Sequence, residues 1–232
     1  MKPIKMALIL CIDTSMENAS ICLGENGAII SKKHNTIQHD HATWIHTAIK
    51  ELLEESSKKI NELSAIAVTA GPGSYTGLRV GMATAKGLCY SLNIPLITES
   101  TLKLIAFAVK ENLKSGYSLP VLLCPMIDAR RMEVFTTIYT IDFDEVFEPS
   151  AVILEQNSFD GQLNQNIVVF CGNGSAKWQY ICNHPNAKFS NVNYDITDLL
   201  ILAEKKYDDH NFSQLAYTEP AYLKNVYTGL KQ

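Results

Sequence analysis

Hydrophobic and polar positions follow one another along the chain in patterns that predict short strands and helices. Continuous or alternating apolar runs predict strands over residues 6–12, 19–24, 28–33, 65–69, 94–98, 120–127, 133–141 and 167–171. A helical period predicts helices over residues 40–57, 77–92, 102–112 and 196–207, and a short helix after residues 172–174. Asp40 is the expected N-cap of the first helix, whose apolar residues share one face.

The order of these elements predicts the fold class. Strand–strand–strand–helix–strand–helix occurs in the first half of the chain and recurs less regularly in the second half. This order favours an α/β fold of two lobes, each with a mixed sheet flanked by helices. We expect an N-terminal lobe over residues 1–101 and a second, degenerate lobe over residues 102–194. A C-terminal helix and tail, residues 195–232, would return to pack on the N-terminal lobe.

Composition and charge narrow the function classes. The chain has 232 residues and a net charge of −4, with no basic stripe, so nucleic-acid binding by this chain alone is not expected. No apolar run is long enough to cross a bilayer. The six cysteines form no C-x-x-C pair and are expected to be reduced small hydrophobic residues. These features predict a cytoplasmic protein with no membrane partner; the acidic run from Asp142 to Glu148 has no role that the sequence assigns.

Two short segments could hold a phosphate. Asp13, Thr14 and Ser15 follow a buried strand, where a carboxylate and hydroxyls could bind a metal–phosphate group or could simply form a hydrogen-bonded turn. The turn "GPGSYTG" could present N–H groups to an anion through Gly71 and Gly73, or those groups could be capped by a nearby hydroxyl. It is not a Walker loop, which requires Lys and Ser/Thr after the last glycine.

The helix after this turn carries small residues on two faces. Gly77, Gly81 and Ala85 are spaced along one face, and Ala83 and Gly87 along another. Glycine costs roughly 1 kcal/mol against alanine inside a helix, so a close approach by another element is expected to offset it. That element could be the sheet of the same chain or a second chain.

The sequence disfavours a metal site and a nucleophilic triad, and it leaves two further motifs with two interpretations each. The six histidines contain no i, i+4 pair, so no catalytic metal site is expected. No Ser–His–Asp or Cys–His arrangement can be identified. The two arginines of "DARRMEVF", residues 128–135, could clamp a carboxylate or phosphate or lie in a solvated turn. Gly172 and Gly174 of "GNG" could lie against an adenine or form a plain strand-to-helix turn.

Several segments together carry a family resemblance. "ILCIDTSMENASICLGENG", "AIAVTAGPGSYTGLRVGMATAKGLCYSLNIPLITESTL", "DARRMEVF", "GNG" and "PAYLKN" occur in this order. The chain resembles the TsaB family, also called YeaZ, of bacterial tRNA threonylcarbamoyladenosine biosynthesis proteins. The resemblance implies a two-lobed actin-like/Hsp70-like ATPase (ASKHA) fold. It also implies a dimer surface and a vestigial nucleotide site. The dimer surface would include Trp44, Ala48, Leu52, Gly77, Val80, Gly81, Thr84 and Ala85. The nucleotide site would include Asp13, Thr14, Ser15, Gly71, Gly73, Gly172 and Gly174.

The resemblance implies a function as well. The related catalytic subunit TsaD carries a metal-binding H-x-x-x-H, and the corresponding residues 95–106 contain no histidine. The implied role is therefore a non-catalytic partner that activates TsaD, the threonylcarbamoyl transferase that acts on the adenosine next to the tRNA anticodon. The ATPase TsaE would join them, with ATP at the interface of the complex and none bound by this chain itself. The chain would be a homodimer in isolation and meet tRNA only through the complex. The alternative is an enzyme in its own right, an ATPase or a metal-independent peptidase.

Overall fold

The structure is a computed structural model that describes residues 7–37, 40–113 and 116–224. The chain divides into two compact units, one of Met1–Leu104 with Tyr194–Pro220 and one of Ile105–Asn193 with Ala221–Gln232. The first unit thus combines the start of the chain with residues 194–220. Of the expected C-terminal segment, residues 194–220 group with the first unit, whereas residues 221–224 group with the second, where Lys224 forms an ion pair with Glu133.

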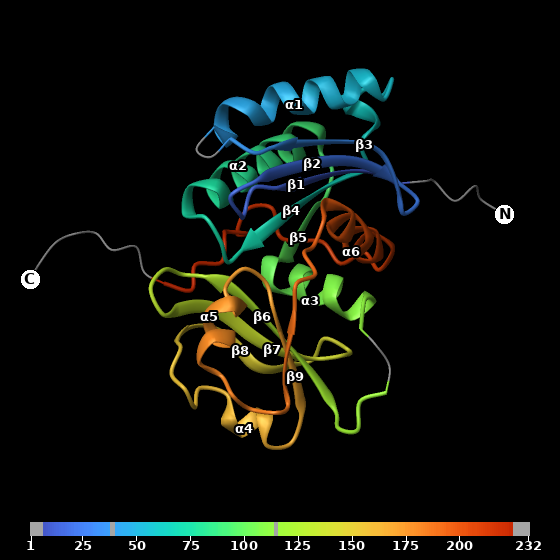
Figure 1. Ribbon diagram of the computed structural model, residues 1–232. Helices are drawn as coiled ribbons and strands as arrows, with labels where there is room; N and C mark the ends of the chain where they lie inside the picture. Colours follow the sequence, from blue (N-terminus) through green and yellow to red (C-terminus); the bar gives the residue numbers. More distant parts are fainter. Residues whose placement is uncertain (1–6, 38–39, 114–115, 225–232) are drawn as a thin grey trace, which may run out of the picture. The chain divides into compact units, whose positions relative to one another are not determined.

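The first unit is built on a five-stranded mixed sheet. Its strands are β1 (Leu8–Asp13), β2 (Ala19–Glu25), β3 (Ala28–Asn35), β4 (Ala65–Gly71) and β5 (Leu96–Ser100), in the order β3-β2-β1-β4-β5. The first three strands form an antiparallel meander, whereas β1, β4 and β5 are parallel. Helices α1 (His41–Glu55) and α2 (Tyr75–Leu92) cover one face of the sheet, and α6 (Ile196–Asp208) covers the other (Figure 1).

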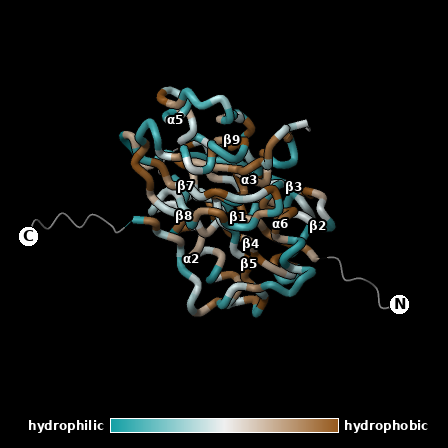
Figure 2. Tube along the Cα trace, turned by 90° about the horizontal axis from the view of Figure 1, so that it is seen from below, coloured by the Kyte–Doolittle hydropathy of each residue, from teal (hydrophilic) through white to brown (hydrophobic). Residues whose placement is uncertain are grey.

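Apolar residues of this sheet and its helices form the core of the first unit. All six residues of β1 are buried, as expected for a strand covered on both faces. Strands β1 and β4 are largely hydrophobic along their length (Figure 2). The expected apolar face of α1 is buried: Ile45, Ala48, Ile49, Leu52 and Leu53. Asp40 is the N-cap residue of α1, as expected, and its carbonyl accepts the Trp44 N–H at 3.0 Å, but its side chain makes no capping hydrogen bond.

The second unit repeats this topology. Its strands are β6 (Val121–Asp128), β7 (Glu133–Thr140), β8 (Glu145–Ile153), β9 (Ile167–Cys171) and β10 (Ala187–Ser190), in the order β10-β9-β6-β7-β8. Strands β6, β7 and β8 form the antiparallel meander, and β6, β9 and β10 are parallel. The two sheets therefore have the same strand pattern, which the less regular second half of the sequence only suggested.

Shorter elements complete the two units. A 3₁₀ turn, Ile60–Glu62, follows α1, and α3 (Thr101–Glu111) follows β5. In the second unit α4 (Asp160–Leu163) precedes β9 and α5 (Ser175–Ile181) follows it. Trp178 of α5 packs between Phe159 and Phe170 and is fully buried. Among the helices of the described residues, none is both long and apolar enough to cross a membrane.

Candidate functional site

The candidate phosphate site lies where strands β1 and β4 end. The two strands are parallel, with Ile12 beside Val68, so their carboxyl ends meet at one edge of the sheet. Strand β1 ends at Asp13 and β4 at Gly71, after which the glycine turn leads into α2. In open α/β sheets this edge is where ligands commonly bind. The structure therefore brings the strand end at Asp13 and the glycine turn together, as the sequence suggested.

The carboxylate of Asp13 is held by four donors from its own unit. Its Oδ1 accepts hydrogen bonds from the Ser15 backbone N–H (2.9 Å), the Ser15 hydroxyl (2.7 Å) and the Thr69 hydroxyl (2.8 Å). Its Oδ2 accepts one from the Tyr194 hydroxyl at 2.8 Å. Asp13 is only 5% exposed, so these bonds satisfy a charge that water barely reaches.

Tyr194 closes this arrangement from a distant part of the sequence. It immediately precedes α6 and lies 181 residues after Asp13, so no local pattern in the sequence marks it. Burial, and then the charge of Asp13, raise the pKa of the Tyr194 hydroxyl well above its usual value. The phenol thus stays protonated and remains a donor to Asp13 at neutral pH.

The glycines of the turn and of α2 lack side chains where the segment after β1 packs closely against them. A Cβ atom at Gly73 would collide with the backbone carbonyl of Ser15, and one at Gly77 with that of Thr14. A Cβ at Gly81 would meet the Thr14 hydroxyl. The glycine face therefore packs against the segment after β1 within the same unit, which lets α2 lie close to the end of that strand.

Hydrogen bonds within the unit also occupy the start of α2. The Ser74 hydroxyl accepts from the Gly77 N–H at 3.3 Å, and the Ser74 N–H donates to the Ser15 carbonyl at 2.7 Å. The Thr14 hydroxyl donates to the Gly77 carbonyl at 2.7 Å. Of the two alternatives for this turn, the structure shows the hydroxyl cap. The Asp13 carboxylate, the Thr14 hydroxyl and the start of α2 thus bond to one another inside the unit.

Gly172 and Gly174 belong to the second unit. Gly172 has φ of 83°, a left-handed conformation that favours glycine, and a Cβ there would collide with the Met126 carbonyl. The Gly174 N–H donates to the same carbonyl at 3.0 Å. These contacts explain both glycines as a tight turn between β9 and α5 that packs against β6.

The eight residues expected at a dimer surface differ in exposure. Six are buried within the first unit: Ala48, Leu52, Gly77, Gly81, Thr84 and Ala85. Trp44 and Val80 are half-buried. The face with Gly77 and Gly81 thus packs inside the chain, because α2 lies close to the strand end of β1 there.

A different face of α2 is open to solvent. We define the α2 outer stripe as the helix face formed by Thr76, Val80, Ala83, Gly87 and Tyr90, which is exposed except for the half-buried Val80. Tyr90 is 83% exposed. A Cβ at Gly87 would meet nothing, so no packing inside the chain explains this glycine. The second small-residue face of the sequence is therefore the one left uncovered.

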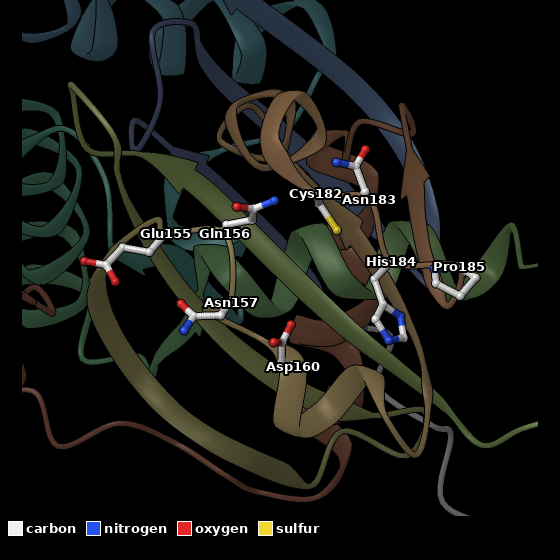
Figure 3. Close-up of a pocket in the computed structure, with 8 residues that line it drawn as sticks. All are labelled: Glu155, Gln156, Asn157, Asp160, Cys182, Asn183, His184 and Pro185. Carbon is white, nitrogen blue, oxygen red and sulfur yellow. The ribbon is translucent and has the colours of Figure 1, made fainter.

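The second unit has an open pocket that the sequence did not indicate (Figure 3). Its volume is about 650 Å³, and its lining is Glu155, Gln156, Asn157, Asp160, Cys182, Asn183, His184 and Pro185. His184 accepts a hydrogen bond on Nδ1 from the Asn186 N–H at 3.2 Å. Within the described residues no hydrogen bond joins Cys182 to His184, so the pocket holds no oriented nucleophile–base pair.

Metal ligation has no candidate among the residues that the structure describes. In that part of the chain, no group of three His, Cys, Asp or Glu side chains is placed to hold a metal ion. One of the six histidines, His39, lies outside the described residues.

Comparisons with known proteins agree on one family. The model of the family described as TsaD, tRNA N6-adenosine threonylcarbamoyltransferase, matches residues 29–226. The TsaB protein of Haemophilus influenzae, a tRNA threonylcarbamoyladenosine biosynthesis protein, is 30% identical and the match covers 96% of each chain. The TsaB protein of Bacillus subtilis is 35% identical over 131 residues, which are 56% of this chain and 54% of that protein.

A solved structure shares the fold. The structure described as YeaZ from Pseudomonas aeruginosa matches with a TM-score of 0.73 at 24% identity, over 94% of this chain and all of that one. Together with the two mixed sheets of equal topology, this match confirms the expected actin-like fold.

Proposed function

Because the chain belongs to the TsaB family of tRNA threonylcarbamoyladenosine biosynthesis proteins, we propose that it is a non-catalytic subunit that binds and activates the transferase TsaD. The modification is N6-threonylcarbamoyladenosine next to the tRNA anticodon. In this proposal the chain is a pseudo-enzyme. Its first unit keeps the architecture of the transferase family but uses it as a scaffold.

The closed strand end is the observation that carries this proposal. Asp13 is the only carboxylate at the expected phosphate position in the sequence, and its two oxygens accept four hydrogen bonds inside the unit. In this proposal these bonds hold Asp13 as part of the scaffold, and a bound phosphate or metal would have to compete with them. Breaking these bonds in a buried site would cost several kcal/mol, since each bond to a charged group contributes about 1.5–3 kcal/mol.

The α2 outer stripe supports a role in binding. A helical glycine costs about 1 kcal/mol, and no atom of the described residues lies within contact distance of a Cβ at Gly87 to offset that cost. Close approach by a helix of a partner would offset it, with Ala83 admitting the same neighbour and Tyr90 supplying aromatic contact area. We place TsaD on this stripe, and a second copy of the chain on the same stripe when TsaD is absent.

Further partners follow from the same role. The ATPase TsaE joins the assembly, and ATP binds at an interface of the complex; the internal hydrogen bonds of Asp13 support this placement over the strand end of the first unit. The chain works in the cytoplasm, where its tRNA substrate is.

Capture of purified TsaD by the immobilised chain tests the proposal. Wild type should retain TsaD, and Gly87→Leu should lose it, because the added side chain blocks close approach. Gly161→Leu is the matched control, since Gly161 is also a helical glycine with open space around it. Failure of the wild-type chain to retain TsaD, or equal retention by Gly87→Leu, would contradict the proposed function or its surface.

A further inference from the structure

The turn between β6 and β7 has an unusual backbone for its sequence. Arg130 has φ of 71° and Arg131 has φ of 49°, so two consecutive residues with long side chains adopt the left-handed region. This conformation costs roughly 1–2 kcal/mol for each such residue. The β2–β3 turn of the same chain meets a similar requirement with Asn26 (56°) and Gly27 (74°), the residue types that favour it. Stability therefore does not account for arginine at positions 130 and 131.

Neighbouring elements hold this turn in place. The Ala129 N–H donates to the Glu133 carbonyl, and the Glu133 N–H donates to the Arg130 carbonyl. The Asp128 carboxylate accepts from the Arg130 N–H at 2.6 Å, and the Asp128 N–H donates to the Asn173 side chain at 2.9 Å. The "DARRMEVF" and "GNG" motifs thus lie together, and the arginines extend from a fixed base.

Lysines already neutralise the carboxylates beside the arginines. Lys177 of α5 forms an ion pair with Asp128 at 2.7 Å, and Lys224 of the "PAYLKN" motif forms one with Glu133. Within the described residues, neither guanidinium of Arg130 and Arg131 contacts a carboxylate, and both residues are exposed. No ion pair among the described residues engages the two guanidinium groups, although Glu155 also lies nearby, directly after Leu154, whose N–H donates to the Met132 carbonyl of the turn.

Charge in the second unit is separated along the sheet. Glu133 begins β7 at the arginine turn, and Thr140 ends it beside the acidic run that starts at Asp142. Eight residues of strand span about 25 Å, more than twice the screening length at physiological salt. Asp142 thus lies well beyond the screening length from the arginine turn, whereas Glu148, on the returning strand β8, lies opposite the middle of β7.

We propose that the β6–β7 turn binds the phosphate backbone of tRNA through the guanidinium groups of Arg130 and Arg131. Guanidinium is the side-chain group best suited to bidentate contact with phosphate. The choice of tRNA as the anion rests on the proposed function, in which tRNA is the polyanionic substrate. Two contacts are too few for tight binding by the chain alone, which agrees with tRNA being held mainly through the complex.

Binding of a fluorescently labelled tRNA transcript tests this proposal. Anisotropy is measured between about 50 and about 200 mM KCl, with the full chain alone and with its complex with TsaD. Arg130→Asn combined with Arg131→Gly removes both charges and supplies residues suited to the backbone. Arg130→Lys combined with Arg131→Lys keeps the charges. Lys50→Asn combined with Lys205→Asn removes two exposed charges elsewhere as the matched control.

The Asn–Gly variant should bind at least tenfold more weakly, and its log–log salt slope should fall by about 2. Its melting temperature should rise, which excludes misfolding as the cause. The Lys–Lys variant should keep the wild-type slope, and the control should keep the wild-type affinity. Unchanged affinity and slope in the Asn–Gly variant would overturn the proposal, as would an equal loss in the control or no wild-type binding in either arm. If TsaD does not bind, the proposed function fails. Weak, salt-dependent binding of tRNA by the chain alone that the Asn–Gly variant reduces would then still support a phosphate site at the turn, and its absence would overturn that site.

Discussion

Glycine has two distinct uses along helix α2. At Gly77 a side chain would collide with the backbone of Thr14, whereas at Gly87 it would meet open space. The first glycine is explained by the fold and the second is not. From the sequence both faces were equivalent, because spacing alone does not say which face the sheet covers. Only the positions of the neighbouring backbone atoms distinguish them.

A pair of alanine substitutions tests this distinction. Gly77→Ala should destabilise the chain by about 2 kcal/mol or more, since a backbone carbonyl cannot move aside as a flexible side chain can. Gly87→Ala should stabilise it by about 1 kcal/mol through higher helix propensity. The free energy of unfolding from urea titration measures both. Equal effects of the two substitutions would show that the faces are not different.

Burial also separates the six cysteines. Five are buried, and burial raises the pKa of both Cys89 and Cys124 to about 12, so their thiolate fraction at neutral pH is very small. Cys182 is half-buried and lines the open pocket. The expectation of buried, reduced cysteines is correct except at this residue.

Thiol labelling of the native chain should therefore be selective. At about pH 8, one thiol per chain should react rapidly with a disulfide reagent, and Cys182→Ser should abolish this fast phase. Fast labelling of several thiols would contradict the buried placement of the other five.

The raised pKa values also determine the direction of a pH effect on stability. The folded chain holds these protons more tightly than the unfolded chain, so the free energy of unfolding should fall as pH rises above about 9.

Helix α6 shows how distant elements complete the first unit. Lys206 forms an ion pair with the buried Glu99 at 2.9 Å and donates to the Thr98 carbonyl at 2.7 Å, which fastens the helix to β5. Tyr194, just before the helix, donates to Asp13. The sequence predicted the helix from its period, but not these contacts, since they join residues more than 100 positions apart.

Lys206→Met should therefore destabilise the chain. Removal of the lysine leaves the buried Glu99 carboxylate without its counter-charge, at a cost of about 2–3 kcal/mol, somewhat below the cost for a fully buried pair. Lys205→Met is the control on the exposed side of the same helix and should change the free energy of unfolding by less than about 0.5 kcal/mol. Equal changes in the free energy of unfolding for the two variants would show that the Lys206–Glu99 ion pair does not stabilise the packing of α6 on β5.

Strongly periodic elements were predictable, and irregular ones were not. The strands and helices of the first unit were expected within a few residues of their bounds, because their apolar positions repeat clearly. Strand β8 was missed because it begins in the acidic run and none of its residues is fully buried, so it lacks a clear apolar pattern. Strand β10 and helix α4 have only four residues each, too few for a pattern to show.

The whole molecule consists of two units of equal topology, and in the first unit hydrogen bonds within the chain occupy the strand end at Asp13. The two sheets have the same strand pattern, and in the first unit Tyr194 completes the hydrogen bonds to Asp13. The sequence indicated that Asp13 and the glycine turn follow two strands, and the structure places these strand ends side by side. The hydrogen bonds of Asp13 could not be predicted, because Thr69 and Tyr194 reach it only in the folded chain.

The rate of tRNA threonylcarbamoylation by TsaD with the added chain tests the central claim most directly. Asp13→Asn keeps the size of the buried side chain and removes its charge, while Gly87→Leu obstructs the α2 outer stripe. The account predicts a near wild-type rate with a folded Asp13→Asn chain, and no stimulation with Gly87→Leu. Loss of the rate in Asp13→Asn with TsaD binding intact would instead show that the Asp13 site takes part in the chemistry.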